Sequence, residues 1–273
     1  MVDLPEKIGR YEIKCQVGMG SMGIVYQAYD PLEDKDVAIK VAKRDVLNDI
    51  NQGSTFRKLF YNEARLAGKL KHPNILGVYD AELEDDESFI VMELVPGGDT
   101  LEPFCKPQNL LPIQKIVEIV FKTAKALDDA HRQGVVHRDI KPSNILIDPE
   151  MDVKIGDFSN SYITRADVTE TQITGLIGSP MYMSPEQLRE ETITGQTDIF
   201  SLGLVLYEIF TGQQAVRGKS LEEIAAVHRQ ASLTNPSTLV NNVDDMVEQV
   251  ILRCLEREPA ARPVSALAVA AAL

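Results

Sequence analysis

The chain has few cysteines and no closely spaced pair of them. Its 273 residues include three cysteines, Cys15, Cys105 and Cys254, which lie far apart in the sequence. No two of them form the CxxC pair that is typical of redox and metal sites. Their number and spacing favour free thiols in a reducing cytoplasm over a disulfide framework.

Long apolar segments are also missing. The densest apolar stretch, Ile199–Phe210, is interrupted by Ser201 and Glu208 and is too short to cross a bilayer. The first residues, MVDLPEKIGRYEIK, lack the apolar core of a signal peptide. We therefore expect a cytoplasmic segment that makes no membrane contact itself, although a longer parent protein could carry an anchor elsewhere.

Positive charge is in deficit. Lys and Arg number 28 against 41 for Asp and Glu, which gives a formal net charge of −13. Phosphate backbones and anionic lipids attract basic surfaces, so this charge argues against a nucleic-acid binder and a polybasic membrane anchor. The hydrophobic share of 44% and the charged share of 25% are ordinary for a globular protein and argue against disorder.

Hydrophobic patterning predicts a sheet-rich first third of the chain. Five runs predict strands: Tyr11–Val17, Ile24–Tyr29, Asp36–Val41, Leu76–Leu83 and Ser88–Leu94. Apolar residues at helical spacing predict one helix over Arg57–Leu70. The breaker run Pro96-Gly97-Gly98 predicts the end of this part.

The rest of the chain is predicted to be mostly helical. The periodic segments are Lys115–Gln133, Asp198–Thr211, Asp244–Leu255 and Val264–Ala272. Asp198–Thr211 is apolar on nearly every face, which predicts a helix buried in a core. The segment between Asp157 and Glu186 is rich in Ser, Thr and Gly, and such a long loop in a compact domain is usually functional or mobile.

A glycine-rich turn separates the first two predicted strands. Gly18, Gly20 and Gly23 form a GxGxxG pattern, in which the backbone can approach a phosphate group and present N–H donors to it. A dinucleotide-binding turn requires a helix after the last glycine, whereas Ile24-Val25 here begins a strand. A plain hairpin turn remains the alternative for this motif alone.

Charged residues at three further places suggest phosphate and metal chemistry. Lys40 ends the apolar run Val37-Ala38-Ile39-Lys40, and Glu63 on the following helix could pair with it, although an isolated strand lysine is more often solvated. The segment His137-Arg138-Asp139-Ile140-Lys141-Pro142-Ser143-Asn144 and the later Asp157-Phe158-Ser159 supply oxygen donors and a base. Oxygen donors suit Mg²⁺, which shares phosphate oxygens. Any one of these carboxylates alone could be a turn or cap residue.

Taken in order, these motifs resemble the protein-kinase signature. The set also includes Ser184-Pro185-Glu186 and Asp198 with Gly203, and the resemblance runs from Tyr11 to Pro263. It is that of a eukaryotic-like Ser/Thr protein kinase catalytic domain of the kind common in bacteria. The resemblance implies an α+β bilobal fold in a single domain, residues 1–273. Residues 1–95 would form an antiparallel five-stranded sheet with one helix, and residues 96–273 a mainly α-helical lobe.

The resemblance also implies roles for individual residues. Asp139 would be the base that receives the substrate hydroxyl proton, with Lys141 beside the transferring phosphate, and Lys40, held by Glu63, would contact the ATP phosphates. Asn144 and Asp157 would bind Mg²⁺, or Mn²⁺ as an alternative. The ATP-binding set would be Val17, Gly18, Gly20, Gly23, Val25, Ala38, Lys40, Met92, Glu93, Val95 and Leu146. Structural roles would fall to Glu186 paired with Arg262, to Asp198, and to His137 and Phe158 in a hydrophobic spine.

Some positions depart from the family pattern. Ser159 stands where the family has the glycine of Asp-Phe-Gly, which we expect to restrict conformational change without abolishing activity. Ser184 replaces an alanine, Ser179 replaces a threonine whose hydroxyl would reach Asp139 and Lys141, and Ala67 is smaller than usual. His131 and His228 carry no role that the sequence reveals.

Arg138 beside Asp139 implies control by phosphorylation of the following loop, because an arginine can pair with phosphate. The preferred acceptors are Thr169, Thr171 and Thr174, with Ser161 and Thr164 less favoured. An exposed threonine-rich loop without a regulatory role is the alternative.

Two other functions stay open at this point. A pseudokinase would bind nucleotide or partners without turnover, which Ser159 alone favours. A small-molecule kinase of the same fold is disfavoured by Lys141 and by the segment Gly178-Ser179-Pro180. Expected partners are ATP and proteins that carry Ser or Thr, with no nucleic acid and with a homodimer left open.

Overall fold

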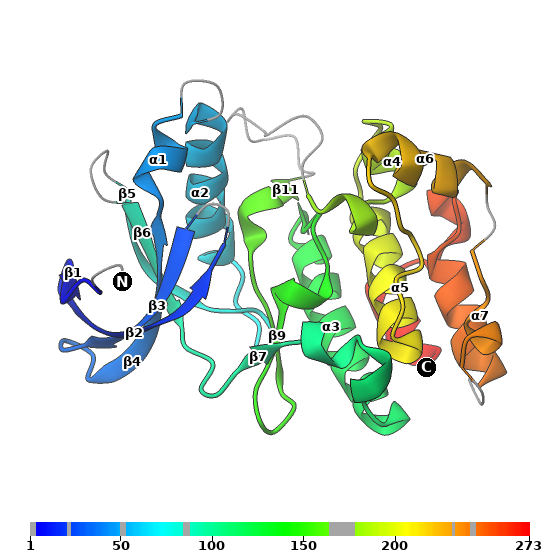
Figure 1. Cartoon of the computed structure of the whole chain (residues 1–273), viewed down its shortest axis with the longest axis horizontal. Coiled ribbons are helices and arrows are strands. Elements are labelled where there is room, and N and C mark those ends of the chain that lie inside the picture. Colours follow the sequence, from blue (N-terminus) through cyan, green and yellow to red (C-terminus); the bar gives the residue numbers. More distant parts are fainter. Residues whose placement is uncertain are drawn as a thin grey trace. The chain divides into compact units, whose positions relative to one another are not determined.

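The computed structural model divides the chain into two compact units, which are described separately (Figure 1). It describes residues 4–20, 23–49, 53–83, 88–163, 178–230, 233–240 and 244–273. Unit 1 comprises Met1–Lys71 and Leu76–Pro96, and unit 2 comprises His72–Ile75 and Gly97–Leu273.

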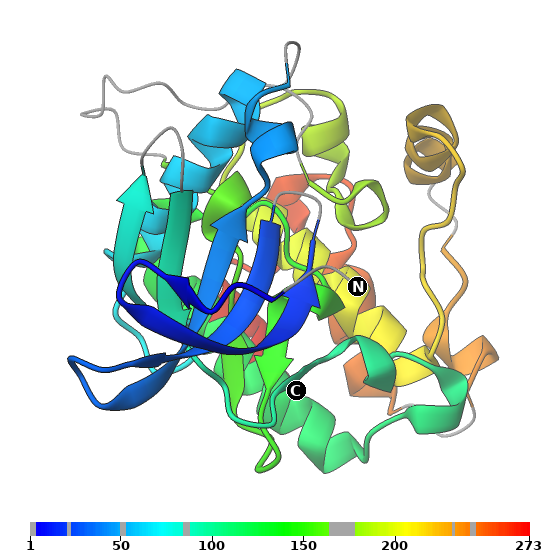
Figure 2. The same ribbon diagram turned by 60° about the vertical axis from the view of Figure 1, so that its left-hand side comes forward.

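Unit 1 is built on an antiparallel sheet (Figure 2). Its strands are β1 (Lys7–Ile8), β2 (Tyr11–Met19), β3 (Gly23–Asp30), β4 (Lys35–Ala42), β5 (Val78–Leu83) and β6 (Ser88–Glu93), in the order β1-β2-β3-β4-β6-β5. The five predicted strands are therefore confirmed, with bounds shifted by one or two residues. The sequence did not predict β1, a two-residue strand that pairs Ile8 with Tyr11.

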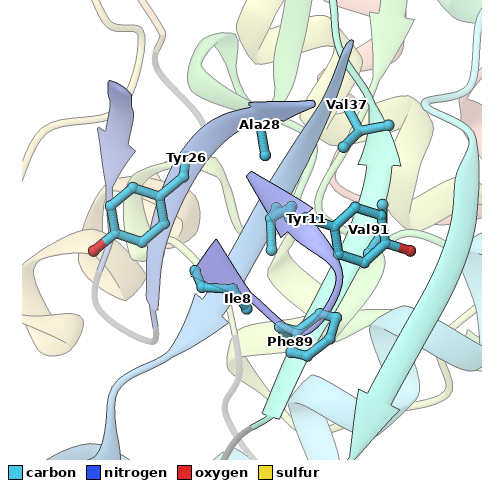
Figure 3. Packing of buried hydrophobic residues seen from close by; sticks show 8 residues of the cluster. Ile8, Tyr11, Tyr26, Ala28, Val37, Phe89 and Val91 are labelled. Carbon is cyan, nitrogen blue, oxygen red and sulfur yellow. The ribbon is translucent and has the colours of Figure 1, made fainter. Parts of the chain in front are cut away.

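A hydrophobic cluster holds this sheet together (Figure 3). It contains Ile8, Tyr11, Tyr26, Ala28, Val37, Ile39, Phe89 and Val91, all buried. Along β3, Tyr26, Ala28 and Asp30 are buried while the residues between them are partly exposed, as the two-residue repeat of a strand requires. The Tyr11 and Phe89 rings meet edge to face with their centroids 6.1 Å apart, which fastens β2 to β6.

Two helices follow β4 in unit 1. They are α1 (Arg44–Leu47) and α2 (Gly53–Ala67), and α2 packs against β5. The helix predicted over 57–70 thus begins four residues earlier and ends three residues earlier. Helix α2 begins at Gly53, although glycine has a low helix propensity. A Cβ at this position would lie 2.3 Å from the Leu47 carbonyl oxygen, so the close approach of the chain requires glycine.

Unit 2 is mainly helical, as predicted. Its helices are α3 (Ile113–Arg132), α4 (Pro185–Leu188), α5 (Gly195–Thr211), α6 (Leu221–Gln230), α7 (Asp245–Cys254) and α8 (Ala266–Ala271). Every residue of α5 from Thr197 to Thr211 is buried, which confirms the prediction of a core helix, and α5 packs against α3, α7 and α8 (Figure 1). A Cβ on Gly203 would lie 2.6 Å from Cys254 Cβ, so the contact between α5 and α7 requires glycine there.

Unit 2 also contains short strands and 3₁₀ turns. The strands β7 (Asp99–Thr100), β9 (Ile145–Ile147) and β10 (Val153–Ile155) form one small sheet, and β8 (Val135–Val136) pairs with β11 (Tyr162–Ile163). The 3₁₀ turns are η1 (Glu102–Phe104), η2 (Pro107–Asn109), η3 (Pro142–Asn144), η4 (Phe158–Asn160), η5 (Pro180–Tyr182), η6 (Pro236–Thr238) and η7 (Pro259–Ala261). Because Ile145 pairs with Ile155, the ends of η3 and β10 lie next to each other.

No helix in the described ranges has the length and apolar composition that crossing a membrane requires.

Candidate active site

An ion pair joins the sheet and the helix of unit 1. The Nζ atom of Lys40 on β4 lies 2.6 Å from Oε2 of Glu63 on α2. Glu63 shares the buried face of α2 with Leu59, Phe60 and Leu66, so the helix directs its carboxylate toward the sheet. The Lys40 side chain is 14% exposed and that of Glu63 is 5% exposed, which holds the ammonium at a partly desolvated position.

The glycine-rich turn joins β2 to β3. The N–H of Gly20 donates to the Gly23 carbonyl at 2.8 Å, and Lys43 Nζ donates to the Gly20 carbonyl at 2.7 Å. A Cβ on Gly23 would lie 2.4 Å from the Val41 carbonyl oxygen, so no larger residue fits. At Gly18 and Gly20 a Cβ would meet only ordinary contacts of 3.7 Å and 3.9 Å. Sterically, the fold of unit 1 therefore needs glycine only at the last of these three positions.

The other nucleotide candidates of unit 1 lie on adjacent strands. Val25 pairs with Lys40, and Ala38 pairs with Met92. Ala38 and Met92 are buried, whereas Val17 is 51% exposed. Glu93 is tied to Gly77 by two bonds, because its N–H donates to the Gly77 carbonyl at 2.8 Å and its Oε2 accepts the Gly77 N–H at 3.2 Å. Val95 follows β6 at a half-buried position, and Leu146 is half-buried on β9 of unit 2.

The carboxylate of Asp139, in the segment between β8 and η3 of unit 2, has four described polar contacts. It is buried, and its Oδ1 accepts the Ser179 N–H at 2.8 Å. Its Oδ2 lies 2.9 Å from Lys141 Nζ and accepts from Asn144 Nδ2 and Asn160 Nδ2, each at 3.3 Å. Three of these donors approach Oδ2 and one approaches Oδ1, so Oδ1 keeps room to accept a further hydrogen bond.

Lys141 and Asn144 are themselves held in place. Lys141 Nζ also donates to Ser179 Oγ at 2.6 Å, so serine at this position supplies a hydroxyl to the lysine and an N–H to Asp139. Asn144 Nδ2 donates to the Asp139 carbonyl at 2.8 Å, which fixes the orientation of the amide group. The structure therefore brings Asp139, Lys141, Asn144 and Ser179 together in one hydrogen-bonded group.

Asp157 follows β10 in a left-handed backbone conformation with φ of 61°. The Ser159 hydroxyl donates to its Oδ1 at 2.7 Å. The Gly156 N–H donates to the Asn144 carbonyl at 2.9 Å, and His137 Nε2 lies 2.9 Å from the Gly156 carbonyl oxygen. These bonds tie the residue before Asp157 directly to the segment that carries Asp139 and Asn144.

The oxygen donors of Asn144 and Asp157 fit a magnesium ion. In the described part of the chain, no three or more His, Cys, Asp or Glu side chains gather into a metal cage. Mg²⁺ is usually held by one or two protein oxygens together with water and substrate phosphates, so a full cage is not required. An amide and a carboxylate are the donor types that this mode needs.

Asp198, in the first turn of α5, holds the backbone just before Asp139. Its carboxylate is fully buried and accepts the backbone N–H groups of His137 and Arg138, both at 2.8 Å. His131 Nε2 lies 2.7 Å from the same carboxylate, a role that the sequence did not reveal because the two residues are 67 positions apart. Burial would raise the pKa of Asp198, but the bond to His131 and the backbone donors outweigh it and hold the pKa low.

A second buried ion pair joins Glu186 on α4 to Arg262. The guanidinium donates to both carboxylate oxygens, at 2.7 Å and 2.8 Å, and Thr197 Oγ1 donates to Glu186 at 3.0 Å. The remaining donors of Arg262 reach the backbone carbonyls of Gln196, Glu256 and Arg257. Burial would raise the pKa of Glu186, yet the bonds and the charge of Arg262 leave the pKa below its ordinary value.

The structure also bears on the departures from the family pattern. Ser159 lies in η4 without a positive φ, so this conformation does not need glycine. Ser184 caps α4 in a capping box with Gln187, which explains the serine in physical terms. Ala67 is buried at the end of α2. The Phe158 and His137 rings lie 4.6 Å apart and are both buried, the arrangement of packing residues.

The predicted phosphorylation sites Thr169, Thr171 and Thr174, and also Thr164, lie outside the described residues. Arg138 is described; it is buried, has φ of 70°, and its guanidinium lies 5.8 Å from the centre of the Tyr162 ring. Ser161 is buried, and its hydroxyl donates to the His137 carbonyl at 3.4 Å.

Comparison with known proteins identifies the family of the chain. The family described as the protein kinase domain matches residues 11–272. The chain belongs to the protein kinase domain family. The kinase domain is 38% identical over 251 residues to the serine/threonine-protein kinase PrkC of Bacillus subtilis, covering 92% of this chain and 38% of that protein. It is 35% identical over 263 residues to the serine/threonine-protein kinase PknB of Mycobacterium leprae, covering 95% of this chain and 42% of that protein. The chain thus spans about two fifths of the length of these relatives.

Proposed function

We propose that this kinase domain transfers the γ-phosphoryl group of ATP to serine or threonine hydroxyl groups of proteins. The observation that carries the proposal is the group around Asp139, a carboxylate fixed from both sides by Lys141, Asn144 and Ser179. The two relatives compared above are named serine/threonine-protein kinases, and each matches more than nine tenths of this chain.

Asp139 would orient the substrate hydroxyl and receive its proton. Phosphoryl transfer passes through a loose transition state, so alignment and charge neutralisation matter more than covalent chemistry. The ammonium of Lys141 lies 2.9 Å from Asp139, where it would meet charge on the transferring phosphoryl group. Ser179 bonds to both residues and would keep their spacing.

Residues of unit 1 would hold the nucleotide. The amides of the turn at Gly18, Gly20 and Gly23 and the ammonium of Lys40 would contact the phosphates. The side chains of Val17, Val25, Ala38 and Met92 would contact the adenine, a role that the family resemblance also implies for Leu146. The Glu93 N–H is bonded to Gly77, so the Glu93 carbonyl and the Val95 N–H are the hinge groups proposed for the adenine edge.

Asn144 and Asp157 would hold Mg²⁺, or Mn²⁺ in its place. When bound, the ion would neutralise phosphate charge and align the phosphates. The protein contributes the orientation of these two side chains, set by the Asp139 carbonyl for Asn144 and by Ser159 for Asp157.

We further propose that units 1 and 2 form a single catalytic domain and that it is regulated by autophosphorylation at Thr169, Thr171 or Thr174, with Arg138 pairing the added phosphate. The charge of −13 leaves nucleic acid out of the proposed partners, which are ATP, proteins with Ser or Thr and a second copy of the chain.

Phosphoamino-acid analysis tests the proposal directly. The purified chain is incubated with γ-labelled ATP, Mg²⁺ and a generic basic protein, and the labelled protein is hydrolysed. Label in phosphoserine or phosphothreonine is expected. Nucleotide binding without any transfer would indicate a pseudokinase, and label confined to a small molecule would indicate a small-molecule kinase. An intact mass that stays unchanged while substrate is labelled would contradict autophosphorylation.

A further inference from the structure

The three residues after Phe158 are all polar, and the side chain of each donates a hydrogen bond to a residue earlier in the chain. Ser159 Oγ donates to the Asp157 carboxylate at 2.7 Å, and Asn160 Nδ2 donates to the Asp139 carboxylate at 3.3 Å. Ser161 Oγ donates to the His137 carbonyl at 3.4 Å. Two consecutive side chains thus reach two different functional carboxylates from one 3₁₀ turn.

Ser159 is fully buried, so its hydroxyl must find a partner inside the protein. One partner is the carboxylate two residues earlier, at a distance of 2.7 Å, which is typical of a hydroxyl bonded to a carboxylate. The turn does not need a glycine at this position, as its φ shows. The side chain of Ser159 therefore makes a contact that a glycine could not make.

Asn160 completes the set of donors around Asp139. Lys141, Asn144 and Asn160 all approach Oδ2, while Ser179 bonds Oδ1 from its own segment. Donors that arrive from different segments restrict rotation of the carboxylate about its bond to Cβ. Asn160 is the member of this set that comes from the turn carrying Ser159.

The turn itself is anchored on both sides. The Phe158 ring packs on His137, and the Ser161 N–H donates to the Phe158 carbonyl at 3.1 Å. Directly afterwards, Tyr162 pairs with Val136 in the short sheet of β8 and β11. A rigid support of this kind is what precise orientation of a functional group requires.

We propose that Ser159 and Asn160 are positioning residues, which fix the carboxylates of Asp157 and Asp139 respectively. The proposal rests on the proposed function. It assigns to serine, at the place of the family's glycine, a part in orienting the carboxylate of Asp157. It also assigns to Asn160 the orientation of the Asp139 carboxylate toward the substrate hydroxyl.

The test of Asn160 separates binding from chemistry. Asn160→Leu keeps the approximate size and removes the donor, and we expect kcat to fall about fivefold, the order of one hydrogen bond, while the KM for ATP stays unchanged. Asn160→Asp places a like charge beside Asp139 and should lower kcat further and shift the acid limb of the pH profile. Asn109→Ala removes an exposed asparagine that also donates one bond, to the Pro103 carbonyl, and serves as the matched control.

The test of Ser159 uses binding in place of turnover. Titration of Mg²⁺ in the presence of a non-hydrolysable ATP analogue, followed by calorimetry, gives the half-saturating ion concentration. We expect Ser159→Ala to raise the half-saturating Mg²⁺ concentration about fivefold. Ser159→Thr keeps the hydroxyl and should give a concentration close to that of the wild type. Ser159→Gly should behave like Ser159→Ala, and it supplies a second variant if the alanine variant folds poorly.

The outcomes distinguish this proposal from the proposed function. If Asp139→Asn loses transfer but Asn160→Leu and Ser159→Ala match the wild type, or improve on it, positioning by these two residues is overturned and the kinase assignment stands. If the wild type itself transfers no phosphate, the proposed function fails first. Thermal melts of every variant, matched to the wild type, exclude loss of folding as the cause.

Discussion

The two units each contain a carboxylate paired with a basic side chain, and the pairs differ in construction. In unit 1, one lysine atom meets one oxygen of Glu63 at 2.6 Å, with the lysine 14% exposed. In unit 2, Arg262 meets both oxygens of Glu186, and its side chain has no exposed surface. A lysine is a mobile point charge, whereas the arginine fork fixes geometry.

This difference suggests that the Lys40–Glu63 pair serves ligand binding, whereas the Arg262–Glu186 pair stabilises the fold. Arg262 also donates to three backbone carbonyls, so its charge is satisfied within the fold. Lys40 stays partly exposed on a strand next to the glycine-rich turn, where a ligand can share its charge. Removing Arg262 should therefore cost folding free energy, and removing Lys40 should mainly cost activity.

The largest effect is expected at Arg262. Arg262→Leu leaves Glu186 buried without its counter-ion, and we expect the free energy of unfolding to fall by about 3 to 5 kcal/mol. Urea denaturation measures this loss. The control is Arg257→Leu, an exposed arginine of the same segment, which should change stability by less than about 0.5 kcal/mol.

The second effect separates activity from stability. Lys40→Met should lower kcat/KM by about 100-fold or more, because a preorganised cation for the phosphates is lost. The accompanying loss in the free energy of unfolding should stay near ~1 to 2 kcal/mol, a little over a third of the loss at Arg262. A melting temperature that falls as far as that of Arg262→Leu would refute the distinction between the two pairs.

The third prediction concerns acid stability of unit 2. Burial lowers the pKa of His228 to about 4, and its ring lies 5.4 Å from that of Phe200, which the Arg262 guanidinium also covers. The unfolded chain binds this proton near pH 6.5, so stability should fall as pH drops from 6.5 toward 4, by on the order of 2 kcal/mol. The contribution of Glu186, whose pKa is lowered, should be lost only at lower pH.

Replacement of His228 separates these two windows. His228→Phe removes this titrating group, so its stability should fall less than that of the wild type between pH 6.5 and 5, with His72, whose pKa burial also lowers, as a remaining contributor. If the variant keeps the slope of the wild type in that range, His228 is not the source of the acid sensitivity.

The smallest effect is expected for an exposed pair in unit 1. Lys7 lies 3.0 Å from Glu12, with side chains 62% and 50% exposed. Lys7→Ala should change the free energy of unfolding by less than about 0.5 kcal/mol, and salt should reduce even that. A larger change in the free energy of unfolding, measured by urea denaturation, would show that the exposed fraction of an ion pair does not predict its contribution to stability.

The sequence predicted elements with strong patterns and missed those set by tertiary contacts. The strands of unit 1 and α5 were found because β-branched alternation and an all-apolar helix leave clear signals. Strand β1 and helix α4 are too short for periodicity, and Gly53 opens α2 through a contact with Leu47 that propensity cannot reveal.

In the candidate site, too, some features could be predicted from the sequence and others depend on tertiary contacts. The spacing of Asp139, Asn144 and Asp157 suggested oxygen chemistry from the residues alone, whereas their roles came from the family resemblance. The contacts of His131 with Asp198 and of Asn160 with Asp139 join segments far apart in sequence, so no local pattern reports them. Ser159 differs from the family pattern in the sequence, but its hydrogen bond to Asp157 is seen only in the structure.

The most direct test of the catalytic assignment is phosphate transfer from Mg-ATP to a basic protein by wild type and Asp139→Asn. Asparagine keeps the size of the side chain and removes the base, so kcat should fall by about 100-fold or more, with a melting temperature close to that of the wild type. Equal transfer by the two proteins would contradict the role assigned to Asp139.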